Sequence, residues 1–236
     1  MQLRDAWERN AAEWVRWART PGHDSYWRYH RDAFLGLVPP PGRLTLDIGC
    51  GEGRLARDLQ TAGHRTIGVD SSPTLVEAAR GADPGGEYVA ADAADLPFPD
   101  GQADLAIAFM SLQDVDDMAG AVGEAARVLE PWGRFVLAVV HPINSAHQLD
   151  REHPERPLVM KDDYFDRRYY RDEIERDGLT VTFESRHWTL QDYFDAMLGA
   201  GLVVDALREI GQDEHPRWSR YPLFLHLRAL RLGPRR

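Results

Sequence analysis

The first apolar residues of the chain recur with the spacing of one helix face. Between Gln2 and Arg19 they fall three, four or seven positions apart, which predicts an amphipathic helix. Pro21-Gly22 interrupts this pattern, and a second helix is expected from Asp24 to Leu37, with Asp24 or Ser25 as its cap. The prolines before Gly42 then close an amino-terminal helical unit.

Beyond Gly42, short apolar runs alternate with amphipathic stretches. The runs expected as strands are Leu44–Ile48, Thr66–Val69, Tyr88–Ala91, Leu105–Phe109 and Phe135–Val140. The stretches expected as helices are Leu55–Ala62, Thr74–Ala79 and Met118–Leu129. Strands that alternate with helices at this spacing predict a parallel α/β sheet covered on both faces.

The pattern is lost between His141 and His187, where the chain is polar, aromatic and charged. So long a stretch inside a compact domain is typical of a lid or binding loop, so residues 142–187 are expected to form one. A helix over Leu190–Ala200 then resumes the pattern. Two strands, Leu202–Ile210 and Pro222–Leu232, have no helix between them, so they are expected to pair antiparallel.

The amino-acid composition argues against several classes of binding partner. The net charge of −10 argues against binding nucleic acid or an anionic membrane surface, both of which require a basic face. The longest apolar runs, such as Phe135–Val140, are too short to cross a membrane, and no signal peptide is recognised at the start. Cys50 is the single cysteine, which favours a reducing compartment. We therefore expect a cytoplasmic protein, monomer or homodimer, acting on a small molecule.

The most informative stretch joins the first strand of the alternating pattern to a helix. It reads Asp47-Ile48-Gly49-Cys50-Gly51-Glu52-Gly53, with glycines at alternate positions. A dinucleotide site requires Gly-x-Gly-x-x-Gly, and here Arg54 stands where its third glycine would be. Asp47 and Glu52 would both repel a pyrophosphate, whereas an acidic group suits a ligand that carries an ammonium. A nicotinamide enzyme and a turn without any ligand are the alternatives.

This Asp-x-Gly-x-Gly-x-Gly pattern resembles the cofactor motif of class I S-adenosylmethionine (SAM)-dependent methyltransferases, in their small-molecule, type 11 branch. The resemblance covers about Leu44 to Val140 and, more loosely, Trp188 to Leu202. It implies a doubly wound, seven-stranded, mostly parallel sheet with an antiparallel last strand. It also implies one domain over 1–236, divided into a helical cap (1–42), a SAM-binding core (43–141), the lid (142–187) and a carboxyl-terminal helix with strands (188–236).

The resemblance also implies which residues contact SAM. In the family, Asp70 would hold the ribose hydroxyls, Asp92 the adenine amino group, and Trp14 would cover the methionine end. Asp70 could instead cap a helix, and Asp92 could instead close a local turn. The expected cofactor residues are Trp14, Asp47, Gly49, Cys50, Gly51, Gly53, Asp70, Ser71, Asp92, Ala93, Phe109, Met110 and Ser111.

The reacting groups are less well specified, because SAM itself carries the chemistry of methyl transfer. The branch often has a histidine where this chain reads Gln113-Asp114, so that base is in doubt. His141 is the candidate catalytic base, because it ends the fifth strand before Pro142; capping of that strand is the alternative. His147 is expected on the surface or in packing. No histidine spacing indicates a metal site. The expected substrate contacts are Gln113, His141, Tyr164 and His187.

These observations predict a SAM-dependent methyltransferase that acts on an oxygen or nitrogen of a small aromatic or natural-product-like molecule. A carbon methyltransferase would have the same cofactor site. A SAM-binding regulatory protein without turnover is a second alternative, kept open by the missing histidine at Gln113-Asp114.

Overall fold

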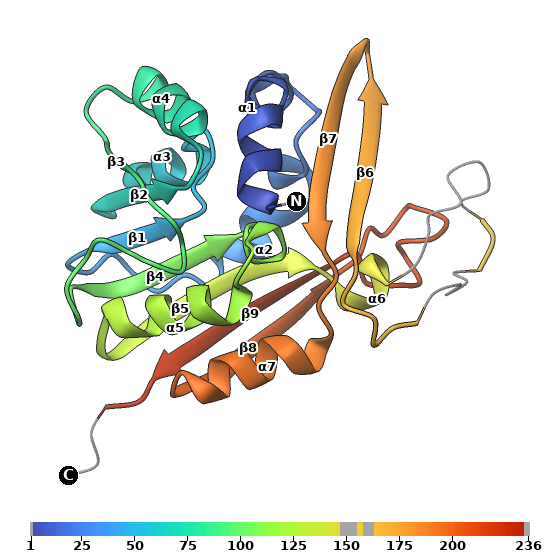
Figure 1. Cartoon of the computed structure of the whole chain (residues 1–236). Coiled ribbons are helices and arrows are strands. Elements are labelled where there is room, and N and C mark those ends of the chain that lie inside the picture. The colour runs from blue at the N-terminus through green and yellow to red at the C-terminus, as the bar shows by residue number, and fades with distance from the viewer. Residues whose placement is uncertain (1, 147–154, 158–162, 234–236) are drawn as a thin grey trace.

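A seven-stranded sheet forms the centre of the chain in the computed structural model, which describes residues 2–146, 155–157 and 163–233. The strand order is β3-β2-β1-β4-β5-β9-β8 (Figure 1). Only β9 runs antiparallel to its neighbours, β5 and β8. The doubly wound, mostly parallel sheet with an antiparallel last strand is therefore confirmed. The strands are β1 (Thr45–Ile48), β2 (Thr66–Asp70), β3 (Glu87–Ala90), β4 (Ala103–Phe109), β5 (Leu129–Val140), β8 (Leu202–Ile210) and β9 (Phe224–Arg231).

Helices cover both faces of this sheet. One face carries α2, α3 and α4, and the other carries α5 and α7 (Figure 1). Two single turns, the π-helical η1 and the 3₁₀ turn η2, complete the cover. The bounds are α1 (Leu3–Arg19), η1 (Tyr26–His30), α2 (Arg31–Leu35), α3 (Arg54–Thr61), α4 (Pro73–Ala82), η2 (Leu112–Asp114), α5 (Met118–Val128) and α7 (Leu190–Gly199).

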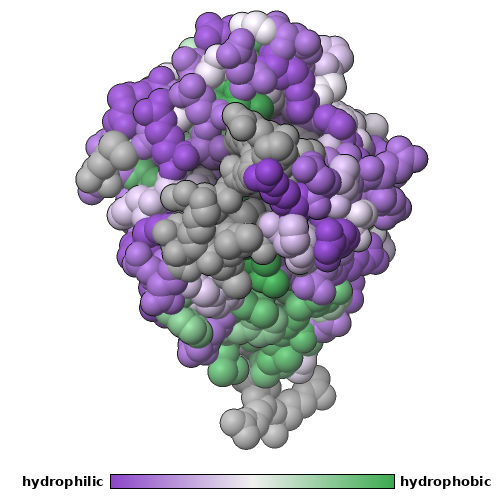
Figure 2. All heavy atoms as spheres, turned by 90° about the vertical axis from the view of Figure 1, so that its right-hand side faces the viewer, coloured by the Kyte–Doolittle hydropathy of each residue, from purple (hydrophilic) through white to green (hydrophobic). Residues whose placement is uncertain are grey.

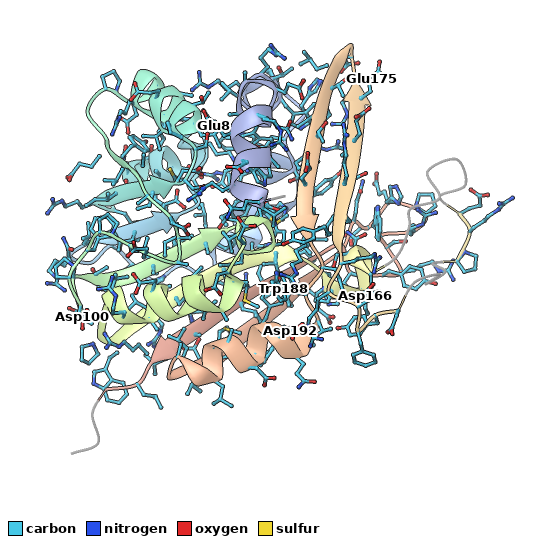
Figure 3. The ribbon with its side chains drawn as sticks, viewed as in Figure 1. Glu8, Asp100, Asp166, Glu175, Trp188 and Asp192 are labelled. Atoms are coloured by element: carbon cyan, nitrogen blue, oxygen red, sulfur yellow. The ribbon has the colours of Figure 1, made fainter. Side chains whose placement is uncertain are left out.

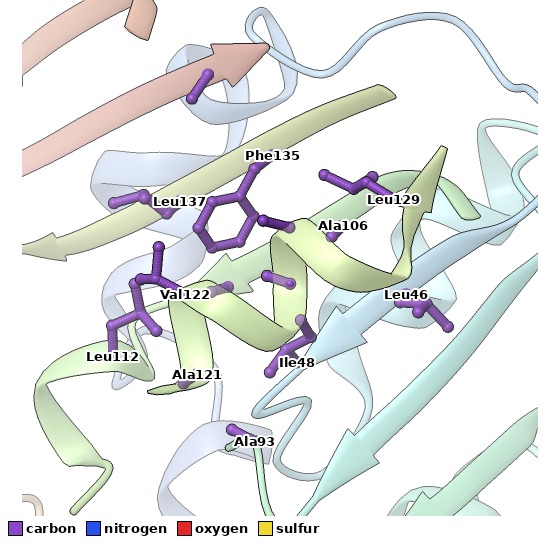
Figure 4. Close-up of a cluster of buried hydrophobic side chains, with 14 of the residues drawn as sticks. Leu46, Ile48, Ala93, Ala106, Leu112, Ala121, Val122, Leu129, Phe135 and Leu137 are labelled. Atoms are coloured by element: carbon purple, nitrogen blue, oxygen red, sulfur yellow. The ribbon is translucent and has the colours of Figure 1, made fainter. Parts of the chain in front are cut away.

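Strand β4 shows how one apolar run serves two cores. Ala106 and Ala108 point to the layer under α5, whereas Leu105 and Ile107 point to the layer under α2 and α3. Successive side chains of a strand face opposite sides, so a strand buried on both faces has to be apolar throughout. The small alanines leave room for Phe135 in the first of these layers (Figure 4).

The expected second helix is not continuous. The structure has the π-helical turn η1 followed by the short helix α2, in place of one helix from Asp24 to Leu37. Asp24 is the cap, because its Oδ1 accepts the backbone N–H of Tyr26 at 3.0 Å. Ser25 makes no side-chain cap bond.

The segment predicted as a lid contains regular structure that the sequence pattern did not reveal. Within 142–187 the chain forms the turn of helix α6 (Pro142–Ser145) and an antiparallel hairpin of β6 (Tyr169–Arg176) and β7 (Leu179–Arg186). Asp177-Gly178 joins the two strands, both residues with positive φ (51° and 76°), as a tight hairpin turn requires. Residues 147–154, with His147, and 158–162 lie outside the described part, so the lid stays a prediction.

The hairpin packs against α1 rather than against the sheet. Figure 1 shows α1 and β7 side by side, above the end of the sheet where the parallel strands finish. Phe183 of β7 meets Trp7 and Trp14 edge to face, with ring centroids 6.3 and 5.9 Å away. Asn10 also donates from Nδ2 to the carbonyl of Thr182 at 3.4 Å. Helix and hairpin therefore form one roof.

The outer surface is predominantly hydrophilic in the view of Figure 2, with hydrophobic residues gathered in its lower part. Leu190 and Leu198 of α7 are among the exposed apolar side chains. Over the residues that the structure describes, no helix is both long and apolar enough to cross a membrane.

Two histidines are buried together between η1 and β9. His30 Nδ1 lies 2.9 Å from His226 Nε2, and neither side chain is exposed. Burial lowers the pKa of both rings, that of His226 from 6.5 to about 4. The pair is therefore neutral in the folded protein at neutral pH, with one ring donating the shared hydrogen bond.

This pair predicts a loss of stability in mild acid. Above pH 6.5 both rings are neutral in the folded and unfolded chain, so their contribution is complete. As pH falls from 6.5 toward about 4, the unfolded chain takes up protons that folded His226 refuses. Each such histidine lowers the free energy of unfolding by up to about 1.4 kcal/mol per pH unit. Urea unfolding at a series of pH values gives the free energy of unfolding as a function of pH. Between pH 6.5 and about 4 this free energy should fall less steeply in His226→Gln than in wild type, and an equal pH dependence would contradict the assignment.

Candidate functional site

A cavity of about 990 Å³ lies at the carboxyl ends of β1, β2 and β4, beneath α1 and the hairpin. This is the edge where open α/β sheets bind ligands. The volume is at the upper end of the range of about 300–1,000 Å³ for small-molecule sites, enough for two ligands. The structure brings most of the predicted site residues together on its wall: Trp14, Asp47, Gly49, Cys50, Gly51, Asp70, Ser71, Asp92, Ala93, Phe109, Met110, Ser111 and Gln113.

The first glycine of the turn is required by a neighbouring strand. Gly49 has φ of +74°, and a Cβ there would lie 2.3 Å from Ser111 Cβ. Ser111 is held in place because its hydroxyl donates to the carbonyl of Ile48 at 2.8 Å. The ends of β1 and β4 therefore approach so closely that no side chain fits between them.

The other two glycines of the turn, Gly51 and Gly53, have different structural roles. Gly51 lines the cavity, and its N–H donates to Asp70 Oδ2 at 2.8 Å. Gly53 has φ of +82° and precedes α3, but it does not line the cavity. A Cβ on Gly53 would meet the hydroxyl of Tyr88 at 2.9 Å, so this glycine allows α3 to pack against β3 and α4. The prediction that Gly53 contacts a cofactor gains no support from its position.

Asp47 is the most unusual group in the wall. Its side chain is 1% exposed, and neither carboxylate oxygen has a hydrogen-bond partner among the described residues. Burial raises its pKa to about 7, against the opposing effect of Arg54. A buried carboxylate without a partner is costly, so this position favours a ligand that brings a positive charge or N–H donors.

Arg54 forms its ion pair with Asp24 and not with Asp47. Its guanidinium pairs with buried Asp24 and lies 4.9 Å from the ring centre of Trp14. This arrangement holds the indole of α1 over the glycine turn, where Trp14 Nε1 is 3.3 Å from the position of a Cβ on Gly51.

Glu52 does not have the electrostatic effect that the sequence predicted. Glu52 is 2% exposed, and it pairs with Arg19 at 2.9 Å and with Arg57 at 2.8 Å. Two guanidinium groups cancel its charge, so Glu52 does not repel a phosphate as the sequence suggested. The negative character of the turn comes from Asp47.

Asp70, the last residue of β2, and Asp92, which follows β3, both line the cavity as predicted. Asp70 accepts the backbone N–H of Gly51 through Oδ2 and that of Ser72 through Oδ1, at 2.8 and 2.9 Å. The cap of α4 is Ser72, which accepts from Leu75, so Asp70 is not the helix cap. Burial raises the pKa of Asp70. Asp92 closes a local turn, the alternative role considered for it from the sequence, because its Oδ1 accepts the N–H of Ala94 at 2.9 Å.

Helix α1 is fastened along the strand ends by polar contacts. Glu8, labelled in Figure 3, bonds to the hydroxyls of Ser72 and Thr74 at the start of α4, the latter at 2.6 Å. At the start of the helix, Asp116 accepts the backbone N–H of Leu3 at 2.9 Å. Arg4 lies 3.7 Å from Asp92. These contacts hold α1 against the segments that follow β2, β3 and β4.

His141, Tyr164 and His187 do not line the cavity. His141 Nδ1 accepts the N–H of Ile143 as the cap of α6, and Nε2 lies 3.1 Å from Glu209. Burial lowers the pKa of His141, against the opposing effect of Glu209. Both ring nitrogens are therefore occupied away from the cavity, and the role of His141 as a base stays a prediction without geometric support.

Tyr164 and His187 hold the chain around the hairpin. His187 is buried between the hydroxyl of Ser145 at 2.7 Å and the carbonyl of Tyr164 at 2.8 Å. The hydroxyl of Tyr164 accepts the N–H of Leu190 at the start of α7, at 3.0 Å. These contacts support packing rather than substrate binding.

Sequence reasoning missed a polar group on the cavity wall. It consists of Asp114, which follows β4, with Ser185 of β7 and Tyr170 of β6. The sequence alone placed Asp114 next to Gln113, just after an expected strand, but did not assign it to the site. Tyr170 belongs to an aromatic stretch from which the sequence predicted substrate contacts, but Ser185 had no signal. The hairpin itself was hidden because β6 alternates in burial without alternating in polarity.

Known proteins resemble this chain in sequence and in structure. The family model of a methyltransferase domain matches residues 46–137. An uncharacterized methyltransferase of Mycobacterium sp. (strain JLS) is 32% identical over 197 residues, 76% of this chain and 69% of that protein. The demethylmenaquinone methyltransferase of Tropheryma whipplei (strain Twist) is 33% identical over 116 residues, 48% of each chain.

A solved structure extends the likeness to the fold. The SAM-dependent methyltransferase from Mesorhizobium loti has a TM-score of 0.67 at 24% identity, covering 88% of this chain and 98% of that one. The chain spans 30%, 66% and 48% of the length of three curated relatives that it matches.

The contact between Gly49 and Ser111 predicts that Gly49→Ala is destabilising. The left-handed φ costs about 1–2 kcal/mol for an L-residue, and the clash adds to that figure. Gly81 in α4 is the matched control, because a Cβ there meets nothing within 4 Å and its φ is not positive. Gly81→Ala should be neutral or stabilise by about 0.5–1 kcal/mol. Urea denaturation measures both, and equal effects would show that the turn is not tightly packed.

Proposed function

Because the chain belongs to the class I SAM-dependent methyltransferase family, we propose that it transfers the methyl group of SAM to a small molecule. The accepting atom is an oxygen or nitrogen, and the acceptor is aromatic or natural-product-like. The observation that carries this proposal is the unpartnered, buried carboxylate of Asp47 in the cavity wall. The α-ammonium of SAM is the cation that such a group lacks.

The wall offers a partner for each part of SAM. Asp47 would hold the ammonium group, and Asp70 has lone pairs left for the ribose hydroxyls after its two backbone bonds. Asp92 and Ala93 would meet the adenine, and Trp14 would cover the methionine end. When bound, SAM supplies a methyl group on a sulfonium, which requires no activation by the protein.

The rest of the cavity supports a second, organic ligand. Aromatic side chains from four separate segments line it there: Tyr29, Tyr170, Trp218 and Phe224. Such side chains present flat apolar faces with occasional polar groups, as small-molecule sites do. The roof of α1 and the hairpin would exclude water while the two ligands are held together. Correct placement alone is worth about 7–11 kcal/mol of the barrier to such a transfer.

A SAM-binding regulator without turnover is the second candidate, favoured by the position of His141 outside the cavity wall. A carbon methyltransferase would share the cofactor contacts proposed above. For the enzyme we further propose a cytoplasmic location, on its single cysteine, and no nucleic-acid or membrane partner, on the acidic net charge of −10.

Calorimetry with SAM, its demethylated product S-adenosylhomocysteine (SAH) and NAD tests the cofactor site. We expect SAM and SAH to bind, and NAD not to bind. Asp70→Asn should weaken SAM binding about tenfold or more, because charge-assisted hydrogen bonds contribute about 1.5–3 kcal/mol each. Asp100→Asn is the control, because Asp100 is exposed at the far edge of the molecule (Figure 3). Tight binding of NAD without SAM, or an unchanged affinity in Asp70→Asn, would contradict the proposal.

His141→Asn separates a base from a cap. Asparagine can still accept the N–H of Ile143 but cannot take up a proton at neutral pH. If His141 is only a cap, the variant should keep its melting temperature and most of its methylation rate, and this is the expected result. A hundredfold loss of rate with unchanged SAM affinity would instead establish His141 as the base.

A further inference from the structure

We propose that the methyl acceptor is an amine, bound through its N–H groups to Asp114, and that this carboxylate takes the proton which the nitrogen has to release. This inference rests on the proposed function and specifies its substrate class.

Asp114 is placed where a reacting group would be needed. It is the last residue of η2, three residues after Ser111, and it lines the cavity. Its Oδ1 accepts the hydroxyl of Ser185 at 2.6 Å, and its Oδ2 accepts Nε2 of Gln113 at 3.2 Å. Each carboxylate oxygen has two lone pairs, so one acceptor site on each oxygen is still free for a ligand.

No cation of the described chain forms a salt bridge with Asp114, although arginines occur elsewhere in the cavity wall. The charged and titratable groups around it are Asp70, Tyr170 and Tyr193, and none of these is a cation at neutral pH. Burial, with a further contribution from Asp70, raises the pKa of Asp114 well above its usual range. A carboxylate in this setting gains most from a ligand that brings positive charge.

Gln113 strengthens the case for nitrogen over oxygen. Its Nε2 donates to the carbonyl of Met110 at 2.7 Å and to Asp114, so two acceptors determine which way the amide faces. Oε1 is then left without a partner among the residues that the structure describes. This corner of the wall thus has unmet acceptors on both Gln113 and Asp114. An alcohol or phenol brings a single O–H, whereas an ammonium group brings three N–H donors.

The proton balance of the transfer is complete with Asp114 alone. A bound ammonium group first gives one proton to the Asp114 carboxylate, which becomes a neutral acid while the amine becomes neutral. The nitrogen lone pair then forms the bond to the methyl carbon as the carbon–sulfur bond breaks, with its electron pair remaining on sulfur. The products are a methylammonium group and SAH, and Asp114 later releases its proton to water.

The test uses matched probes that differ only in the group offered to Asp114. The amines are 2-phenylethylamine, tyramine and tryptamine, each paired with the alcohol and the carboxylic acid of the same skeleton. Calorimetric titration into the full chain saturated with SAH measures their affinities without turnover. At least one amine should bind about tenfold or more tightly than its alcohol and its acid, as a charge-assisted contact predicts.

Two variants establish where the preference arises. Asp114→Asn should lower the affinity for the amine to that for its alcohol, while SAH binding and the melting temperature stay unchanged. Asp100→Asn is the control, because Asp100 is exposed and pairs with Arg127 instead of lining the cavity. It should keep the preference for the amine. With SAM in place of SAH, the best amine should give an N-methyl product in wild type and far less in Asp114→Asn.

Failure of this inference is distinguishable from failure of the proposed function. Absence of SAM and SAH binding would remove the proposed function itself. Normal SAH binding with no amine preferred over its alcohol would overturn only the inference. A preference for the carboxylic acid would also overturn it, because it would assign the acceptor to arginines of the cavity wall, among them Arg28, Arg168 and Arg217. Persistence of the amine preference in Asp114→Asn would also overturn it.

Discussion

The burial of Asp47 without a partner is the constraint on which the site depends. An ionised carboxylate removed from water costs several kcal/mol unless a cation or donors compensate it. The parallel sheet places Asp47 near the end of β1, just before the glycine turn, where neither of its carboxylate oxygens has a hydrogen-bond partner among the described residues. The fold thereby keeps a negative site that a cationic ligand can satisfy.

The roof of α1 and the hairpin converts an open strand edge into a chamber. Trp14 has two roles in it, because the indole contacts Phe183 of the hairpin and also lies beside Gly51 and Arg54. Ligand binding at the glycine turn and closure over the acceptor would therefore involve the same side chain. Glu8 and Arg19 anchor the same helix to α4 and Glu52.

Charges in this cavity differ in what compensates them. Arginines compensate Glu52 fully, Asp70 is satisfied in part by backbone N–H groups, and Asp47 has no partner within the described residues. Asp114 receives two neutral donors and forms no salt bridge to a described cation. This gradation separates structural carboxylates from those available to a ligand, and it assigns Asp47 to the cofactor and Asp114 to the acceptor in the proposals above.

The sequence by itself determined the sheet, the order of its elements and the glycine turn, because helix and strand periods and left-handed glycines are local properties. It could not determine which acidic groups remain uncompensated. Glu52 is neutralised by Arg19, 33 positions away, and Asp114 meets Ser185, 71 positions away, across the hairpin. His141, which sequence position favoured, is turned toward α6 and Glu209. Only tertiary structure decides such pairings, since Coulomb and hydrogen-bond energies depend on distance in space.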